Sequence, residues 1–482
     1  MSRHLPLCLM LLTLAASAVA QARPERPNII LILCDNLGYG DVGCYGSKRH
    51  RTPHVDRLAA EGVKLTGFYV ASGVCSPSRA AILTGCYPRR VNMDVPDNAG
   101  RVLQPVAPKG LNPDEVTIAE VLKTQGYATT IIGKWHQGDQ PDFLPTRQGF
   151  DSYFGIPYSD DMTARDGKPW PPLPLMRNEQ VVEAPADRDT LTLRYTQEAQ
   201  RFIQEHRDQP FFIYLPHAMP GSTKTPYRSE AFRGTSANGP WGDSVEEIDW
   251  STGEIMKTLA EHQLDDRTLV VWTSDNGAPN RNPPQGSNAP LKGWGYDVSE
   301  GAMRMPCLIR WPGQVKAGVT SRELCTSMDL LPTFADLAGA KLETNGPIDG
   351  KDIWPILSGD PQAKSPHKAF YYYWGDQLQA VRTAHPAWKL YLPVENKLGV
   401  RNPPPGPSPA ELYDLDADIA EGQNVAANHP DVVKQLEQLA DQARAELGDH
   451  GHPGSGQRPA GWVESPTARV MVGSKYRASG ID

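Results

Sequence analysis

Short apolar runs with the length of buried strands recur along the first 275 residues of the chain. The run at 28–33 is apolar throughout after its first residue, as expected for a strand that is covered on both faces. Further runs of this kind lie at 128–132, 211–215 and 269–272. Segments with helical periodicity separate them, at 113–125, about 190–206 and about 243–262. This alternation predicts a largely parallel sheet covered by helices.

The pattern changes beyond about residue 360. Shorter strand-like runs and one amphipathic helix follow, at 369–374, 388–392, 411–415 and 431–447. We therefore predict an α/β fold with a catalytic domain at 25–360 and a small C-terminal α+β subdomain at 361–450. The remaining segment, 451–482, is rich in Gly and Pro and is predicted to be an extended tail.

The N-terminus has the pattern of a secretory signal peptide. Arg3 and His4 precede an apolar stretch at 5–16, and Ala18-Val19-Ala20 is a small-x-small cleavage site. The apolar stretch is short for a membrane anchor, so we expect no membrane span. The sequence therefore predicts a signal peptide at 1–20 and a secreted or periplasmic protein.

Composition narrows the range of functions. A chain of 482 residues with a formal net charge of -8 is not expected to bind nucleic acid. If such an acidic chain handles an anionic group, it must build a local positive pocket. Six cysteines remain beyond the signal peptide, and their spacing assigns neither disulfides nor a zinc site.

Polar side chains follow the predicted strands at their carboxyl ends. Asp35-Asn36, Lys134 with His136, His217, and Asp275-Asn276 each come just after one of the runs. Parallel strands end at one edge of a sheet, which is where open α/β sheets bind ligands. Each of the two Asp-Asn pairs alone is more typical of a turn. Four polar segments at one edge of the sheet, however, indicate a site.

The run 75–85, Cys-Ser-Pro-Ser-Arg-Ala-Ala-Ile-Leu-Thr-Gly, places a nucleophile just ahead of a predicted helix. Free backbone N–H groups and the helix dipole favour an anion there, and Arg79 adds a permanent positive charge. A structural cysteine near a helix cap needs none of these neighbours. The run therefore indicates an anion-handling site built on Cys75.

The same run resembles the signature of type I sulfatases, and the resemblance extends over most of residues 26–425. It is greatest to the arylsulfatase A and N-acetylgalactosamine-6-sulfatase group. The resemblance implies an alkaline-phosphatase-like sandwich with a large, mostly parallel central sheet. It also implies that a formylglycine-generating enzyme oxidises Cys75 to formylglycine, whose hydrate attacks a sulfate ester.

A hard cation is the expected cofactor. Asp35, Asn36, Asp275 and Asn276 offer carboxylate and amide oxygens, which suit Ca²⁺ better than Mg²⁺ and do not suit a thiolate-binding metal. The resemblance adds residue 75 as a ligand. In the family the segment after the first strand usually reads Asp-Asp, so Asn36 replaces one carboxylate and lowers the negative charge of the site.

Three further residues take roles from the resemblance. Gly133-Lys134-Trp135-His136 matches a segment whose lysine contacts sulfate and whose histidine hydrogen-bonds the formylglycine hydrate. A lysine there offsets charge on the sulfuryl group, and a near-neutral histidine can take the hydrate proton. Ser159 matches a serine that approaches the lysine, although it could equally be a loop serine bonded to its own backbone.

The chain departs from the family at two positions. Gly221 stands where a histidine usually protonates the leaving oxygen, and His217 lies four residues earlier. Gly295 stands where a second lysine usually lies, and Lys292 is three residues upstream. His217 is either a shifted replacement or a structural histidine. Lys292 and Lys224 are candidates for the missing positive charge.

The expected activity is release of inorganic sulfate from a sulfated carbohydrate or an aryl sulfate. Arg79 and the metal would orient the hydrate made from Cys75, and His136 would help to regenerate the aldehyde. Two alternatives stay open. One is a phosphoester or phosphonate hydrolase on the same scaffold, and the other is a sulfated-glycan-binding protein with weakened turnover.

Overall fold

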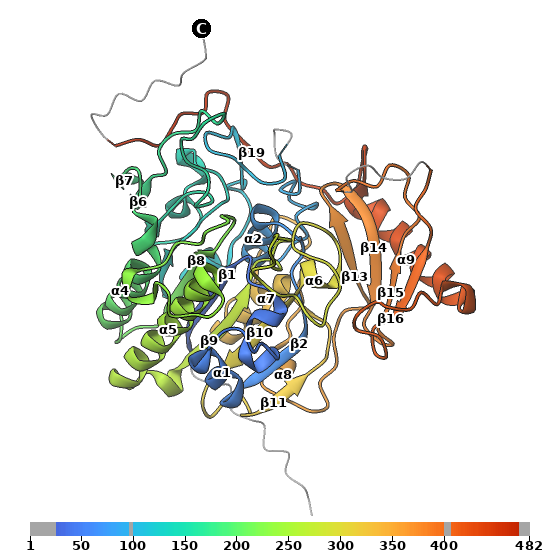
Figure 1. The fold of residues 1–482 in the computed structure, drawn as a ribbon, viewed down its shortest axis with the longest axis horizontal. Coiled ribbons are helices and arrows are strands. Elements are labelled where there is room, and N and C mark those ends of the chain that lie inside the picture. Colours follow the sequence, from blue (N-terminus) through green and yellow to red (C-terminus); the bar gives the residue numbers. More distant parts are fainter. Residues whose placement is uncertain (1–25, 96–99, 400–405, 472–482) are drawn as a thin grey trace, which may run out of the picture.

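An eleven-stranded mixed sheet forms the centre of the protein (Figure 1). The computed structural model describes residues 26–95, 100–399 and 406–471, so the predicted signal peptide lies outside the described residues. The strands of the sheet are β1 (Asn28–Asp35), β2 (Val63–Tyr69), β4 (Ala128–Ile132), β5 (Ser152–Gly155), β6 (Leu175–Arg177), β7 (Gln180–Glu183), β8 (Phe211–Pro220), β9 (Thr268–Ser274), β10 (Arg304–Arg310), β11 (Val319–Ser321) and β12 (Cys325–Thr326).

The middle of this sheet is parallel. Its order is β11-β2-β10-β9-β1-β8-β4-β5-β6-β7, and β12 also pairs with β2. Strand β1 pairs in parallel with β8 and β9, and β4 pairs in parallel with β8 and β5. The carboxyl ends of these strands therefore meet at one edge, which confirms the predicted, mostly parallel sheet.

Helices cover both faces of the sheet. The helices of the described residues are α1 (Pro53–Ala60), α2 (Cys75–Thr84), α3 (Ile118–Lys123), α4 (Leu191–Glu205), α5 (Gly239–Glu261), α6 (Glu300–Met303), α7 (Leu330–Ala338), α8 (Trp354–Leu357) and α9 (Pro430–Leu447), of which α9 packs against a second sheet. Side chains of β1 alternate between two cores. Ile29 and Leu31 share one core with residues of α2, α3 and α7, whereas Ile30 and Ile32 share the other with residues of α1, α4 and α5. This alternation explains why β1 is apolar throughout.

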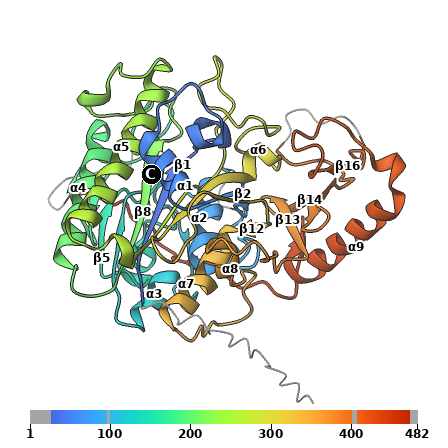
Figure 2. The same ribbon diagram turned by 90° about the horizontal axis from the view of Figure 1, so that it is seen from below.

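A second sheet lies beside the first (Figures 1 and 2). It contains β13 (Ala369–Trp374), β14 (Gln377–Thr383), β15 (Trp388–Tyr391) and β16 (Glu411–Asp414), all antiparallel, with α9 packed against it. The short pairs are β17 (Gly448–Asp449) with β18 (His452–Pro453) and β19 (Gly461–Trp462) with β3 (Lys109–Gly110). Through β19, the segment after α9 returns to the first domain. The domain boundaries at 360 and 450 stay predictions.

Two element predictions were wrong. The helix expected at 113–125 spans only Ile118–Lys123, because Thr117 caps it. The Thr117 hydroxyl accepts from the Glu120 N–H at 3.3 Å, and the Glu120 carboxylate accepts from the Thr117 N–H at 2.8 Å. Strand β8 continues to Pro220 instead of ending at residue 215, since its last residue pairs with Asp35 of β1.

Candidate active site

The site is centred on Cys75, the first residue of α2. Val74, directly before it, is extended (φ -138°, ψ 155°), and no side chain caps the helix. The N-terminal N–H groups of α2 are therefore available near the thiol. Only 3% of Cys75 is exposed. Burial raises the pKa of the thiol well above its usual range, although Lys134 and Arg79 act in the opposite direction.

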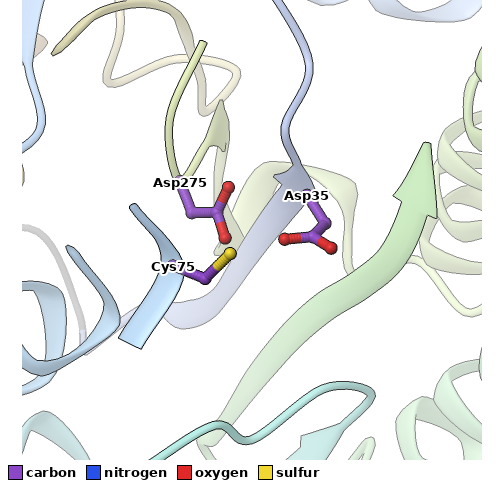
Figure 3. Close-up of side chains that lie close together, drawn as sticks. All are labelled: Asp35, Cys75 and Asp275. Carbon is purple, nitrogen blue, oxygen red and sulfur yellow. The ribbon is translucent and has the colours of Figure 1, made fainter. Parts of the chain in front are cut away.

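Two carboxylates from adjacent strands face the thiol. Asp35 is the last residue of β1, and Asp275 follows β9, its parallel neighbour. One oxygen of each carboxylate and Cys75 Sγ all lie within 4.8 Å of one another. Figure 3 shows the three side chains pointing into a common space. The predicted neighbourhood of these residues is therefore present.

Two amides complete this group. Asn36 has a left-handed backbone (φ 64°), and its N–H donates to Asp275 Oδ1 at 3.0 Å. Asn276 Nδ2 donates to Asn36 Oδ1 at 2.5 Å, while Asn276 Oδ1 is buried and has no hydrogen-bond partner in the described part of the chain. A buried, unpartnered oxygen beside two carboxylates is the environment that a hard cation satisfies. The donor set therefore fits Ca²⁺ or Mg²⁺.

Two buried cations lie against the carboxylates. Arg79 donates to Asp275 Oδ2 from Nε at 3.0 Å and from Nη2 at 2.7 Å, and to Asp35 Oδ1 at 3.2 Å. Lys134 Nζ donates to the two oxygens of Asp35 at 2.9 and 3.0 Å and to Ser159 Oγ at 3.4 Å. Ser159 thus approaches the lysine. Arg79 Nη1 also holds the backbone oxygen of Lys134, at 2.9 Å.

These contacts set the charges of the two carboxyl groups. Burial acts to raise the pKa of Asp35, but Lys134 and Arg79 outweigh it and hold the pKa below its usual range. Burial and the neighbouring Asp35 raise the pKa of Asp275. A divalent cation between the two carboxyl groups would favour the ionised form of both.

Tight backbone packing places the segment that carries Lys134 and His136. Gly133 has φ 135°. A Cβ on Gly155 would lie 1.8 Å from the carbonyl oxygen of Gly133. His136 is also left-handed, at φ 60°. Its Nε2 lies 3.0 Å from the Leu103 carbonyl oxygen, which can only accept, so Nε2 carries the proton. His136 Nδ1 is buried, and its lone pair has no hydrogen-bond partner among the described residues.

Three of the sequence candidates have no hydrogen bond or ion pair with the group around Cys75 in the described residues. His217 was expected beyond the end of its strand but is buried within β8, and neither ring nitrogen has a hydrogen-bond partner among the residues that the structure describes. Burial lowers its pKa to about 4. Lys292 Nζ lies 4.8 Å from the ring centroid of Tyr413, in the C-terminal sheet. Lys224 is an exposed loop residue after β8.

The two glycines that replace family residues are held in place by close packing. A Cβ on Gly295 would lie 2.2 Å from the Gly277 oxygen, which leaves no room for a side chain. Gly221 is left-handed (φ 74°), and a Cβ there would lie 2.9 Å from Asp160 Oδ1. Neither position accepts a lysine or a histidine without rearrangement.

Sequence reasoning missed Tyr296 as a residue that links the site to a cavity. Its backbone is left-handed (φ 80°), its N–H donates to the Gly73 oxygen at 2.9 Å, and its hydroxyl lies 3.5 Å from Ser222 Oγ. Asn36 Nδ2 donates to the same Ser222 Oγ, at 3.1 Å. No motif marks this tyrosine in the sequence.

Tyr296 also lines a cavity of about 270 Å³, whose other walls include 72–74, directly before Cys75. The exposed Arg101 guanidinium lies over the rings of Tyr296 and Trp374, 6.0 and 5.7 Å from their centroids. Trp374 Nε1 donates to the backbone carbonyl oxygen of Tyr296 at 3.0 Å, which holds the indole ring against this segment. The cavity therefore borders the segment that leads into Cys75.

Comparisons with known proteins agree with this geometry. The sulfatase family model matches residues 27–340, and the model of the N-sulphoglucosamine sulphohydrolase C-terminal region matches residues 293–446. Human arylsulfatase A is 38% identical over 89% of this chain and 89% of its own length. Human N-acetylgalactosamine-6-sulfatase is 40% identical over 75% of this chain and 71% of its own length.

Among solved structures, Ps i-CgsB in complex with k-i-k-neocarrahexaose superposes with a TM-score of 0.73 at 30% identity. The match covers 87% of this chain and 92% of that one. These comparisons do not favour the phosphoester, phosphonate or glycan-binding alternatives. In the described residues, no helix is both long enough and apolar enough to cross a membrane.

Proposed function

This chain belongs to the sulfatase family of enzymes that hydrolyse sulfate esters, and we propose on that premise that its substrate is a sulfated carbohydrate. The observation that carries the proposal is the grouping of Cys75, Asp35 and Asp275 with Arg79 and Lys134 at the start of α2. The aromatic cavity next to this group supports a sugar as the leaving alcohol, because sugars stack on aromatic side chains.

The proposed site has the following parts. A maturation enzyme converts Cys75 to formylglycine, whose hydrate supplies the nucleophilic hydroxyl. Asp35, Asn36, Asp275, Asn276 and residue 75 would hold Ca²⁺, which when bound would supply a Lewis acid for the sulfate oxygens.

The other residues act directly on the ester. Arg79 and Lys134 hold positive charge beside the sulfuryl oxygens, where negative charge accumulates during the reaction. His136 Nδ1 is the free base that accepts a proton when the sulfate product is expelled. These roles rest on the resemblance of the motifs and on the side-chain positions described above. Export through the segment 1–20 rests on the sequence pattern of that segment.

A mass measurement tests the maturation step. The tryptic peptide 65–79, from protein made with a formylglycine-generating enzyme, should carry formylglycine at residue 75. Sulfate release from sulfated monosaccharides, sulfated oligosaccharides, aryl sulfates and steryl sulfates then tests the substrate class. An unmodified thiol in a maturation-competent host would contradict the proposed nucleophile. Higher kcat/KM on aryl or steryl sulfates than on every sugar sulfate would contradict the carbohydrate.

Variants in the cavity sharpen this test. Trp374→Ala should raise KM for the best sugar sulfate by about tenfold or more and change little for a small aryl sulfate. Arg101→Gln should raise KM only for sugars that carry a second anionic group. Trp462→Ala is the matched control, because Trp462 is 61% exposed and lies outside the cavity. An equal effect of Trp374→Ala on sugar and aryl sulfates would contradict a sugar-stacking role.

A further inference from the structure

Asp160 is a buried acid without a partner, next to the site. Its side chain is inaccessible to solvent, and neither carboxyl oxygen has a hydrogen-bond partner in the described residues. Its backbone is fixed, because Arg188 Nη1 donates to the Asp160 backbone oxygen at 3.1 Å. A buried polar group of this kind needs an explanation, and a role in catalysis is a common one.

Asp160 is connected to the site through Ser159 and through Gly221. Its neighbour in the chain, Ser159, is 3.4 Å from Lys134 Nζ, which in turn holds Asp35. The second connection is Gly221, whose N–H donates to the Asp35 backbone oxygen at 3.0 Å. Asp160 Oδ1 is 2.9 Å from the point where a Cβ on Gly221 would be. Because residue 221 is a glycine, the carboxyl group has room beside the pocket.

The environment keeps this acid protonated. Burial raises the pKa of Asp160 to about 8, the negative charges of Asp161 and Asp35 act in the same direction, and Lys134 and Arg188 oppose them. The group is therefore an O–H donor at neutral pH. It is within electrostatic range of the pocket and has no acceptor of its own.

Hydrolysis of an alkyl sulfate needs such a donor. When the S–O bond breaks, its electron pair stays on the alcohol oxygen, which is a poor leaving group unless it receives a proton. The pocket cations are engaged already, Arg79 with Asp275 and Asp35, and Lys134 with Asp35. His136 is buried and its pKa is held well below its usual range, so it is a base and not an acid.

We propose that Asp160 is the general acid that protonates the leaving alcohol during sulfate ester hydrolysis. As sulfur gains the attacking hydroxyl oxygen and loses the alcohol oxygen, the Asp160 proton moves to the alcohol oxygen. Asp160 becomes a carboxylate and regains a proton from water after the alcohol departs. The inference rests on the proposed function, since it assigns a role within that same site.

Leaving-group dependence tests this role. Asp160→Asn keeps the shape of the side chain but removes the proton, and kcat/KM is measured on aryl sulfates of graded leaving-group acidity and on one alkyl sulfate. For the alkyl sulfate the loss should be about 10²- to 10⁴-fold. For the most acidic phenol, which leaves without a proton, it should be below about fivefold. Asp166→Asn, at an exposed position in the same loop, is the matched control.

Other outcomes decide against the inference. An equal loss across the whole series would make Asp160 a structural residue, and no loss on the alkyl sulfate would leave it without a role. If Asp160→Asn does not fold, as judged by its thermal melting curve, Asp160→Ser is measured on the same series with the same expectation. Wild-type enzyme that cleaves aryl and alkyl sulfates but no sugar sulfate would contradict the carbohydrate substrate alone, and the series would still decide the role of Asp160.

Discussion

Replacing Lys389 by Met should destabilise the protein by about 3–5 kcal/mol at neutral pH, because it removes one partner of a buried ion pair. Lys389 Nζ lies 3.0 Å from Glu300 Oε1 and 3.1 Å from Glu421 Oε1, and all three side chains are fully buried. Lys389 belongs to β15 and Glu300 opens α6. The pair therefore joins the C-terminal sheet to the catalytic domain.

The magnitude follows from the charge state of Glu300. Burial acts to raise the pKa of Glu300, but Lys389, Arg304 and Arg382 lower it from 4.5 to about 2. A fall of this size corresponds to about 3 kcal/mol of stability. Because the folded pKa is the lower one, this stability is fully present above about pH 4.5 and is lost as the pH falls through 2. Lys389 makes the largest favourable contribution to it.

Equilibrium urea unfolding at pH 7, followed by tryptophan fluorescence and checked for reversibility, measures the loss. Glu300→Gln and the double variant complete a mutant cycle, in which the double variant should lose clearly less than the sum of the single variants. The difference between wild type and Lys389→Met should shrink below about pH 4.5. Lys341→Met, in the exposed pair with Glu343, should leave the unfolding midpoint unchanged. A loss under about 1 kcal/mol, or strict additivity, would refute the reasoning.

Three further changes test the site. Arg79→Lys keeps the charge but loses the two hydrogen bonds to Asp275, so kcat/KM for sulfate release should fall about 100-fold or more. A fall of less than about threefold would show that only the charge of Arg79 matters. Asn36→Asp adds a carboxylate to the metal group and should tighten Ca²⁺ binding about tenfold by titration calorimetry, and weaker binding would count against Asn36 as a ligand. Gly155→Ala forces a Cβ against the Gly133 oxygen and should cost about 3 kcal/mol in urea unfolding, whereas Gly422→Ala, whose Cβ would meet only the Asp418 carboxylate at ordinary contact distance, should cost little.

The positions of the central strands could be predicted from the sequence, because a strand that is buried on both faces is a continuous run of apolar residues. The runs that became β1 and β9 are apolar at nearly every position, since each strand contributes side chains to both cores, and β4 does the same through Ile131 and Ile132 although it also contains two threonines. Residues at the ends of those strands were then brought together by the parallel pairing alone, as with Asp35 and Asp275. The hydrophobic pattern and the parallel order of the strands were therefore sufficient to predict that Asp35 and Asp275 lie close together.

Contacts that depend on distant partners were not predictable. The end of β8 is set by the pairing of Pro220 with Asp35, 185 positions away in the chain, so His217 could not be placed inside the strand from its neighbours. The direction of Lys292 is set by the ring of Tyr413, in another sheet. Asp160 gave no signal, because an unpartnered acid in the interior looks the same in sequence as one in a surface loop.

Charge balance connects the metal group with substrate selection. Asp35 and Asp275 contribute two negative charges when ionised, and Arg79 and Lys134 contribute two positive ones, so these four side chains are neutral together. The whole protein carries a net charge of -8, which repels anions. A divalent cation would give the pocket a net charge of +2, which exceeds the single negative charge of a sulfate ester and equals the charge of the sulfate dianion that is released. The pairing of each cation with a carboxylate therefore makes anion binding depend on the metal, while Asp160, protonated and neutral, adds a proton donor without adding negative charge.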